Sequence, residues 1–193
     1  VHSQSTLEGL LELRREHGFA PEDIDRVRIE TFDVAYHIIG GGEEGDKKAV
    51  RTKEEADHSL PYLAAVALID GTVMPGQYTD ERIGGKDVQE LLRRVTVTVS
   101  RELSDRFPDF MPCTVTVALK DGTLLRREKQ DYEGYHTNPM RWETVVDKFT
   151  VLAGPFLGEG AVRDIVSAVK QLDRMDVADL MELLGDRLPG SGS

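Results

Sequence analysis

The chain has 193 residues, of which 39% are hydrophobic, and this length and composition suit one soluble globular domain with a sizeable core. Its net charge of -11, from 35 acidic and 24 basic residues, disfavours partners such as nucleic acid and anionic membranes. No run approaches the roughly 20 apolar residues of a membrane helix, and no signal-peptide pattern is present, so we expect a cytoplasmic protein. The single cysteine, Cys113, excludes an internal disulfide and cannot by itself hold an iron–sulfur cluster or a cysteine zinc site.

The first predicted element is a helix over residues 5–17. Ser5 and Glu8 have the spacing of a capping box, and Gly18 follows the last apolar position. The next predicted element is a strand over residues 27–31, where apolar and charged residues alternate. The chain therefore begins with a helix and a strand that each bury one face.

Hydrophobic periodicity predicts further helices on both sides of a central group of strands. The predicted helices cover residues 60–70, 78–83, 87–94, 142–153, 161–172 and 177–184. The remaining strands cover residues 95–99, 115–119 and 123–129. Asp121-Gly122 between the last two is a strong hairpin signal. We therefore predict an α+β fold, an antiparallel sheet of about four strands with helices packed on one face, plus C-terminal helices.

The segment 53–71, KEEADHSLPYLAAVALIDG, carries the densest functional signal. Apolar residues occupy nearly every side of its helix, so the helix should be buried almost all round. Either Asp57 or Ser59 can cap its start, and Gly71 ends it. His58 is thus expected at the N-terminus of a buried helix.

A basic cluster precedes this helix in an otherwise acidic protein: Lys47, Lys48, Arg51 and Lys53. A helix N-terminus adds positive potential at the same place, so an anionic substrate could be held there. Solvated lysines on a surface loop are the alternative.

Two other patterns predict no site. Residues 40–45, GGGEEG, satisfy GxGxxG literally, but no helix follows and two carboxylates would repel a pyrophosphate. We interpret this segment as a mobile loop. The five histidines show no metal-ligand spacing, so no metal site is predicted.

Several segments resemble the MmgE/PrpD (2-methylcitrate dehydratase) superfamily, which includes cis-aconitate decarboxylases. Residues 53–71 are similar to its TxETADHSxPYxxAVALxDG signature. The segment that begins at His2, HSQSTLEGLLELR, is similar to the family's HxQTAxEAALxLR segment. YHIIG from Tyr36, VTVALKDG from Val115, and residues 134–149 also follow the family's order and spacing.

The resemblance implies a division of the chain. Residues 1–135 would form the family's smaller, second α+β domain, residues 136–187 closing helices packed on it, and residues 188–193 a disordered tail. The family's large all-helical domain has no counterpart in this sequence. Since the family's active site lies between its two domains, we expect this chain alone to lack a complete site and to be inactive.

The resemblance also implies roles for individual residues. His58 and Tyr36 would be catalytic, with Asp57 supporting His58. Lys53 or Arg51 would hold a substrate carboxylate. His2 and Gln4 would line the same cleft.

The implied reaction is dehydration of 2-methylcitrate or a related tricarboxylate without metal or other cofactor, by removal of a proton α to a carboxylate and loss of a hydroxyl. The expected partners are the tricarboxylate, a helical domain in the same chain or a separate subunit, and a second copy in a homodimer. Two alternatives stay open: a cis-aconitate decarboxylase-like enzyme, and a non-catalytic binding module that retains the fold.

Overall fold

The computed structural model describes residues 2–41 and 46–185. By its contacts the chain divides into two compact units, residues 1–138 and 139–193. The GxGxxG pattern falls largely outside the described residues, as do residues 188–193, for which a disordered tail is predicted. How the C-terminal helices pack on the first unit stays a prediction.

The first unit is built on a four-stranded sheet of order β2-β1-β3-β4. The strands are β1 (Ile24–Thr31), β2 (Val95–Val99), β3 (Cys113–Leu119) and β4 (Leu124–Lys129). The pairs β1–β3 and β3–β4 are antiparallel, and Asp121-Gly122 lies in the predicted hairpin. These findings confirm the predicted α+β class.

The pair β1–β2 is parallel, which the strand patterns do not reveal. A parallel pair needs a crossover connection that returns the chain to its starting end. Residues 32–94 supply this crossover, and they contain the predicted buried helix. The sheet is therefore mixed, with one parallel pair at the β2 edge.

In its described residues, 32–41 and 46–94, the crossover contains seven short helical segments. They are α2 (Asp33–Ala35), the π-helix η2 (Tyr36–Gly40), α3 (Lys53–Asp57), α4 (Leu60–Asp70), the 3-10 helix η3 (Pro75–Tyr78), α5 (Asp80–Ile83) and α6 (Lys86–Arg93). A 3-10 turn, η1 (Pro21–Asp23), precedes β1, and α7 (Arg101–Ser104) follows β2.

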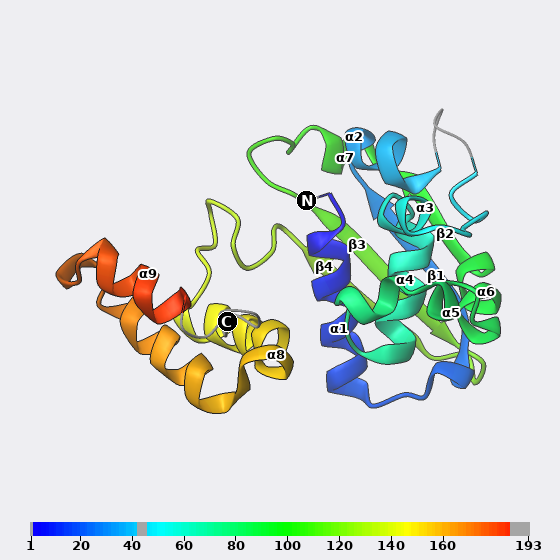
Figure 1. The fold of residues 1–193 in the computed structure, drawn as a ribbon. Coiled ribbons are helices and arrows are strands. Elements are labelled where there is room, and N and C mark those ends of the chain that lie inside the picture. Colours follow the sequence, from blue (N-terminus) through cyan, green and yellow to red (C-terminus); the bar gives the residue numbers. More distant parts are fainter. Residues whose placement is uncertain (1, 42–45, 186–193) are drawn as a thin grey trace. The chain divides into compact units, whose positions relative to one another are not determined.

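Helices α1 (Gln4–His17) and α4 cover one face of the sheet, and α6 packs beside α4 (Figure 1). Every residue from 60 to 68 is buried, as the apolar composition of that segment predicts. Ser59 caps α4 by accepting a hydrogen bond from the Tyr62 N–H at 3.0 Å, and Gly71 ends the helix with a φ of 74°. Of the two caps considered, Ser59 is the one used.

The capping box predicted at Ser5 is wrong. Helix α1 begins at Gln4, and Ser5 is buried in its first turn. Glu8 pairs instead with the edge strand: its carboxylate accepts the Glu133 N–H at 3.0 Å and lies 3.3 Å from the Lys129 ammonium. Glu8 therefore makes tertiary contacts with Lys129 and Glu133 instead of a capping-box hydrogen bond.

The second unit consists of α8 (Trp142–Lys170), the 3-10 turn η4 (Leu172–Arg174) and α9 (Val177–Gly185). Gly158 adopts a φ of 77° inside α8, so the element is two helices joined at a kink, as the two predicted segments require. The two halves enclose an apolar cavity of about 160 Å³, lined by Trp142, Phe149 and Ile165 among others.

Candidate functional site

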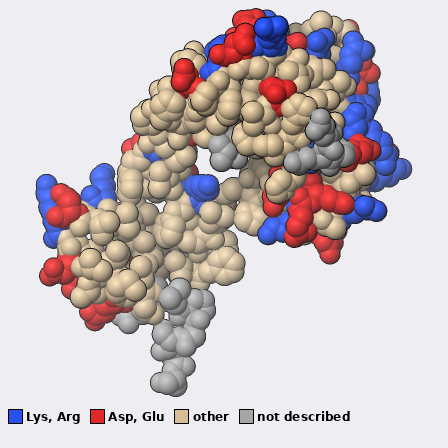
Figure 2. Space-filling view, turned by 90° about the horizontal axis from the view of Figure 1, so that it is seen from above, with Lys and Arg blue, Asp and Glu red and all other residues tan. Residues whose placement is uncertain are grey.

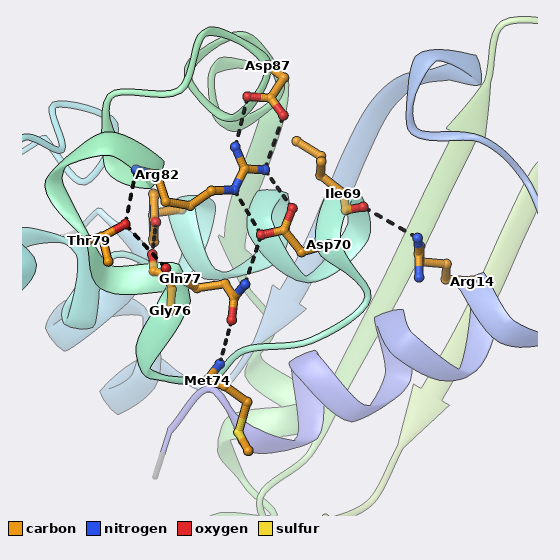
Figure 3. Close-up of polar contacts among 10 residues, drawn as sticks. Arg14, Ile69, Asp70, Met74, Gly76, Gln77, Thr79, Arg82 and Asp87 are labelled. Carbon is orange, nitrogen blue, oxygen red and sulfur yellow. Dashed lines mark hydrogen bonds and ion pairs between the residues drawn. The ribbon is translucent and has the colours of Figure 1, made fainter. Parts of the chain in front are cut away.

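Helices α1 and α4 present their N-termini at the same end of the first unit. The Arg14 guanidinium, in the last turn of α1, donates a hydrogen bond to the Ile69 carbonyl, in the last turn of α4, at 3.4 Å (Figure 3). Because the C-terminal ends are joined, the two helices run in the same direction. Their positive dipole ends therefore point to one side of the sheet.

The corner between α3 and α4 carries His58 and Ser59. Ser59 is fully buried, and its hydroxyl donates to the Lys47 carbonyl at 2.5 Å. His58 is exposed, and its Nδ1 lies 3.1 Å from the Glu54 carbonyl oxygen. A carbonyl only accepts hydrogen bonds, so Nδ1 must carry a proton, which leaves Nε2 of the neutral ring as a free acceptor. This is the arrangement that a proton carrier needs.

Asp57 is the last residue of α3. No hydrogen bond joins its carboxylate to the His58 imidazole among the contacts of residues 46–185. Burial, and next to it the Asp57 charge, raises the pKa of Tyr78 to about 12. Helix α3 packs against η3, which contains Tyr78.

A capping box formed by Thr52 and Glu55 stabilises the start of helix α3. The Glu55 N–H donates to the Thr52 hydroxyl at 3.3 Å, and the Thr52 N–H donates to the Glu55 carboxylate at 3.2 Å. The Arg51 N–H donates to the same carboxylate at 2.7 Å, and the Arg51 side chain, 80% exposed, pairs with it at 3.2 Å. The Arg51 guanidinium lowers the pKa of Glu55. Arg51 is therefore already partly neutralised.

Of Lys53 and Arg51, the two cations proposed to bind a carboxylate, Lys53 is the more available. It is exposed in the first turn of α3, and no hydrogen bond or ion pair engages its side chain within the described ranges. Lys48 instead donates to the Arg93 carbonyl at 3.1 Å. Figure 2, which looks onto this end of the molecule, shows basic side chains beside acidic ones rather than one continuous basic field.

Tyr36 lies in the π-helix η2, which follows directly on β1 and α2 and contacts α4. A Cβ atom built on Gly40 would lie 3.0 Å from both the Tyr36 ring and the Val97 side chain. Glycine at position 40 thus lets the Tyr36 ring pack against the backbone. His37 faces Asp33 at 3.0 Å on the exposed side.

His2 and Gln4 lie at the start of α1, close to the end of β1. The His2 ring meets the Phe32 ring edge-on, with centroids 6.0 Å apart, and burial lowers the pKa of His2. Gln4 is exposed. The end of β1 and the starts of α1 and α4 thus bring the candidate residues to one end of the unit (Figure 1). No hydrogen bond, ion pair or ring contact joins His58 to Tyr36 or His2 in the described part of the chain.

One polar cluster, at the C-terminal end of α4, has no signature in the sequence. The Arg82 guanidinium donates to Asp70 at 2.7 and 2.8 Å and to Asp87 at 2.9 and 3.1 Å, while the Gln77 amide donates to Asp70 at 3.1 Å (Figure 3). Arg82 lowers the pKa of Asp87. The sequence spacing of these residues follows no helical or strand pattern, so only the fold reveals the cluster.

Comparison with known proteins identifies the family. Residues 1–174 match the MmgE/PrpD C-terminal domain. The chain belongs to the MmgE/PrpD family.

Curated relatives carry two kinds of name. Mouse cis-aconitate decarboxylase is 24% identical over 86% of this chain and 32% of its own length. The mitochondrial 2-methylcitrate dehydratase of Yarrowia lipolytica is 28% identical over 94% of this chain and 36% of its own length. The 2-methylcitrate dehydratase of Salmonella typhi is 25% identical over 94% of this chain and 39% of its own length. This MmgE/PrpD chain therefore spans about a third of the length of these relatives.

No helix among residues 2–41 and 46–185 has the length and apolar character to cross a membrane.

Proposed function

We propose that this chain forms one wall of the active site of a cofactor-independent lyase that dehydrates 2-methylcitrate or a related tricarboxylate. The observation that carries the proposal is the corner at His58. There Nδ1 of the exposed His58 lies 3.1 Å from the Glu54 carbonyl oxygen, directly before the N-terminus of α4, and α3, which ends one residue earlier, carries the exposed Lys53 in its first turn. A site for a tricarboxylate needs both a proton carrier and positive charge to hold carboxylates.

The chemistry assigned to the site is an elimination. A base removes the proton α to a carboxylate, and the C–O bond breaks as the leaving hydroxyl takes up a proton and departs as water. In this proposal His58 Nε2 carries one of these protons, Tyr36 lies in the substrate cleft, and Lys53 or Arg51 holds a carboxylate. Asp57 supports His58, and His2 and Gln4 line the cleft wall.

The rest of the site would come from a helical partner, in the same polypeptide or as a separate subunit, within a homodimer. The second unit offers the kind of surface that such a partner covers, since Phe156 and Val177 are 76% and 72% exposed. The one cysteine is buried and free, which suits the cytoplasm.

A second candidate is decarboxylation of cis-aconitate, because relatives named for that reaction match most of this chain. It would need the same carboxylate-holding cations and a group that protonates carbon after CO₂ departs. A third candidate is a non-catalytic module that binds a tricarboxylate or a protein without turnover.

Turnover separates the three candidates. The chain, with its helical partner supplied in cis or in trans, should be given 2-methylcitrate and cis-aconitate in separate assays. Dehydration raises the ultraviolet absorbance of a conjugated product, whereas decarboxylation releases CO₂. Absence of both, with binding retained, would establish the non-catalytic module.

The role of His58 has its own test in the same assay. His58→Gln should lower kcat by about 10²-fold or more, because a positioned proton carrier contributes at least that much. His17→Gln is the matched control, since His17 is exposed at the far end of α1. Full turnover by His58→Gln would remove His58 from the mechanism.

A further inference from the structure

The sheet of the first unit has two different faces. Helices α1 and α4 cover one of them, where Ile29 and Val115 are fully buried (Figure 1). Alternate residues of each strand point to the opposite face. There the Arg28 side chain is 61% exposed and Leu124 is 65% exposed. The sheet therefore places one face in the core of this unit and leaves the other exposed.

The strand register arranges the charged residues of the exposed face in two rows. Arg28 of β1 and Arg126 of β4 lie in register with the same residue of β3, the strand between them. Two positions along, Glu30 of β1 and Glu128 of β4 are related in the same way. One row across the sheet thus carries two arginines, and the next row carries two glutamates.

The positions between and beside these charges carry short side chains. Thr116 and Thr114 of β3 separate the two arginines and the two glutamates, and Thr96 and Thr98 continue the two rows on β2. No residue longer than threonine therefore interrupts either row. A second sheet can approach such a surface to about 10 Å, the usual spacing of sheets packed face to face.

Ion pairs within the chain leave the charges of this face available to a partner. Arg28 donates to Glu30 at 3.1 Å, and Arg106 lies 3.4 Å from Glu128. Exposed pairs of this kind contribute little, and each carboxylate can still accept from a second guanidinium. Arg126 is exposed, and within the described ranges no hydrogen bond or ion pair engages its side chain.

We infer that this exposed face binds a second copy of the same chain. The two-fold axis lies in the interface and runs across the strands, between the arginine row and the glutamate row. Rotation about this axis places the glutamate row of each copy over the arginine row of the other, so Glu30 meets the partner subunit's Arg28 and Glu128 meets the partner subunit's Arg126. The surface is self-complementary, as a two-fold interface requires. The inference deepens the proposed function, which places the chain in a homodimer.

Sedimentation velocity of the full chain, from about 1 µM to 1 mM, measures the association without any need for turnover. This range suits a reversible dimer whose interface is one face of a four-stranded sheet. Because the contacts are charged, the Kd should rise about tenfold or more between roughly 50 and 500 mM sodium chloride. A chain that stays monomeric at about 1 mM, or a Kd that does not change with salt, would overturn the inference.

Charge reversal tests the geometry. Arg126→Glu and Glu128→Arg should each raise the Kd about 10²-fold or more, because the two-fold axis turns two attractive pairs per dimer into like-charge contacts. The double variant Arg126→Glu/Glu128→Arg should restore the dimer, since it only exchanges the two charges. Arg15→Glu changes the net charge equally on α1, which covers the opposite face, and should leave the Kd unchanged.

Mixing the two single variants is the decisive experiment. One variant carries two glutamates on β4 and the other carries two arginines, so an equimolar mixture should form a mixed dimer although each variant alone is monomeric. Misfolded chains could not recombine in this way. A mixture that stays monomeric, or single variants that dimerise as tightly as wild type, would disprove the proposed interface.

The outcome is separable from that of the turnover assays. If the mixed dimer forms but the chain completed by its helical partner turns over neither 2-methylcitrate nor cis-aconitate, the interface stands and the proposed function fails. Turnover by a chain that shows no self-association would retain the proposed function and remove the interface.

Discussion

At the scale of single residues, the site is a set of side chains whose roles are set by their hydrogen-bond partners. His58 is exposed yet oriented, because the Glu54 carbonyl fixes its tautomer. Asp57 is adjacent in sequence, and its negative charge, second to burial, raises the pKa of Tyr78. The ADHS motif at residues 56–59 could be recognised from the sequence, whereas the hydrogen-bond partners of its side chains could not.

The tyrosines of this region predict an alkaline limit to stability. Burial raises the pKa of Tyr62 and of Tyr78 to about 12, above the ordinary value of 10. Because the folded-state pKa exceeds the unfolded one, their contribution is fully present below pH 10 and is lost as the pH rises from about 10 to 12. Urea unfolding at a series of pH values should show this fall.

Tyr78→Phe should make that fall shallower, and Asp57→Asn should lower the pKa of Tyr78 by removing a nearby negative charge. Tyrosine-selective carbon-13 NMR measures the second effect directly. An unaltered Tyr78 titration in Asp57→Asn would show that the Asp57 charge does not act on Tyr78.

The carboxylate-holding role predicts a difference between two exposed lysines. Lys53→Ala should raise KM for a tricarboxylate about tenfold in the completed enzyme, corresponding to one lost charge-assisted contact. Lys86→Ala, on α6 with a side chain 91% exposed, should leave KM unchanged. Equal KM values for both variants would exclude Lys53 from the site.

At the scale of elements, helix ends decide much of the local architecture. Gly18 and Gly71 both end helices in the left-handed region, with φ of 61° and 74°. A Cβ on Gly18 would meet nothing within 4 Å, whereas a Cβ on Gly71 would lie 2.0 Å from the Arg14 guanidinium. The second glycine thus also permits the α1–α4 contact.

The two glycines form a natural comparison. Gly18→Ala should cost about 1 kcal/mol of unfolding free energy from the left-handed backbone alone. Gly71→Ala should cost more, since Arg14 must also move from Ile69. Thermal or urea unfolding measures both values, and equal losses would mean that Arg14 adjusts without cost.

The Asp70–Arg82–Asp87 cluster predicts the largest loss on removal of one side chain. Arg82→Ala would leave the Asp70 carboxylate largely buried without its partner, at a cost of about 3 kcal/mol. Arg51→Ala, which breaks an exposed pair, should change stability by less than about 1 kcal/mol. Similar losses for the two variants, measured by urea unfolding, would show that burial does not distinguish these pairs.

At the scale of the whole molecule, the first unit has its own core and the second has few buried side chains. The described part of α8 buries only Ala161, Val162, Ile165 and Ala168 below the exposure typical of core residues. The first unit, by contrast, buries α4 completely along residues 60–68. The two units should therefore differ in their ability to fold alone.

A chain truncated after Asn138 tests this difference. Its unfolding free energy should match that of the full chain within about 0.5 kcal/mol, since its core lies within residues 2–138. Residues 139–193 alone should form helix without a cooperative transition. A large loss of stability in the truncated chain would mean that the C-terminal helices support the first unit.

Local signals in the sequence predict the element types, the buried helix at residues 60–70, the β3–β4 hairpin and the family, because periodicity, turn residues and the ADHS motif at residues 56–59 involve no distant partner. The fold was needed to reveal the parallel β1–β2 pair, the Glu8–Lys129 ion pair and the packing of α3 against η3. These depend on contacts between residues far apart along the chain, such as Glu8 with Lys129, and no local pattern encodes such distances. The candidate site shares this division: its residues could be named from the motif, but their orientation arises from packing.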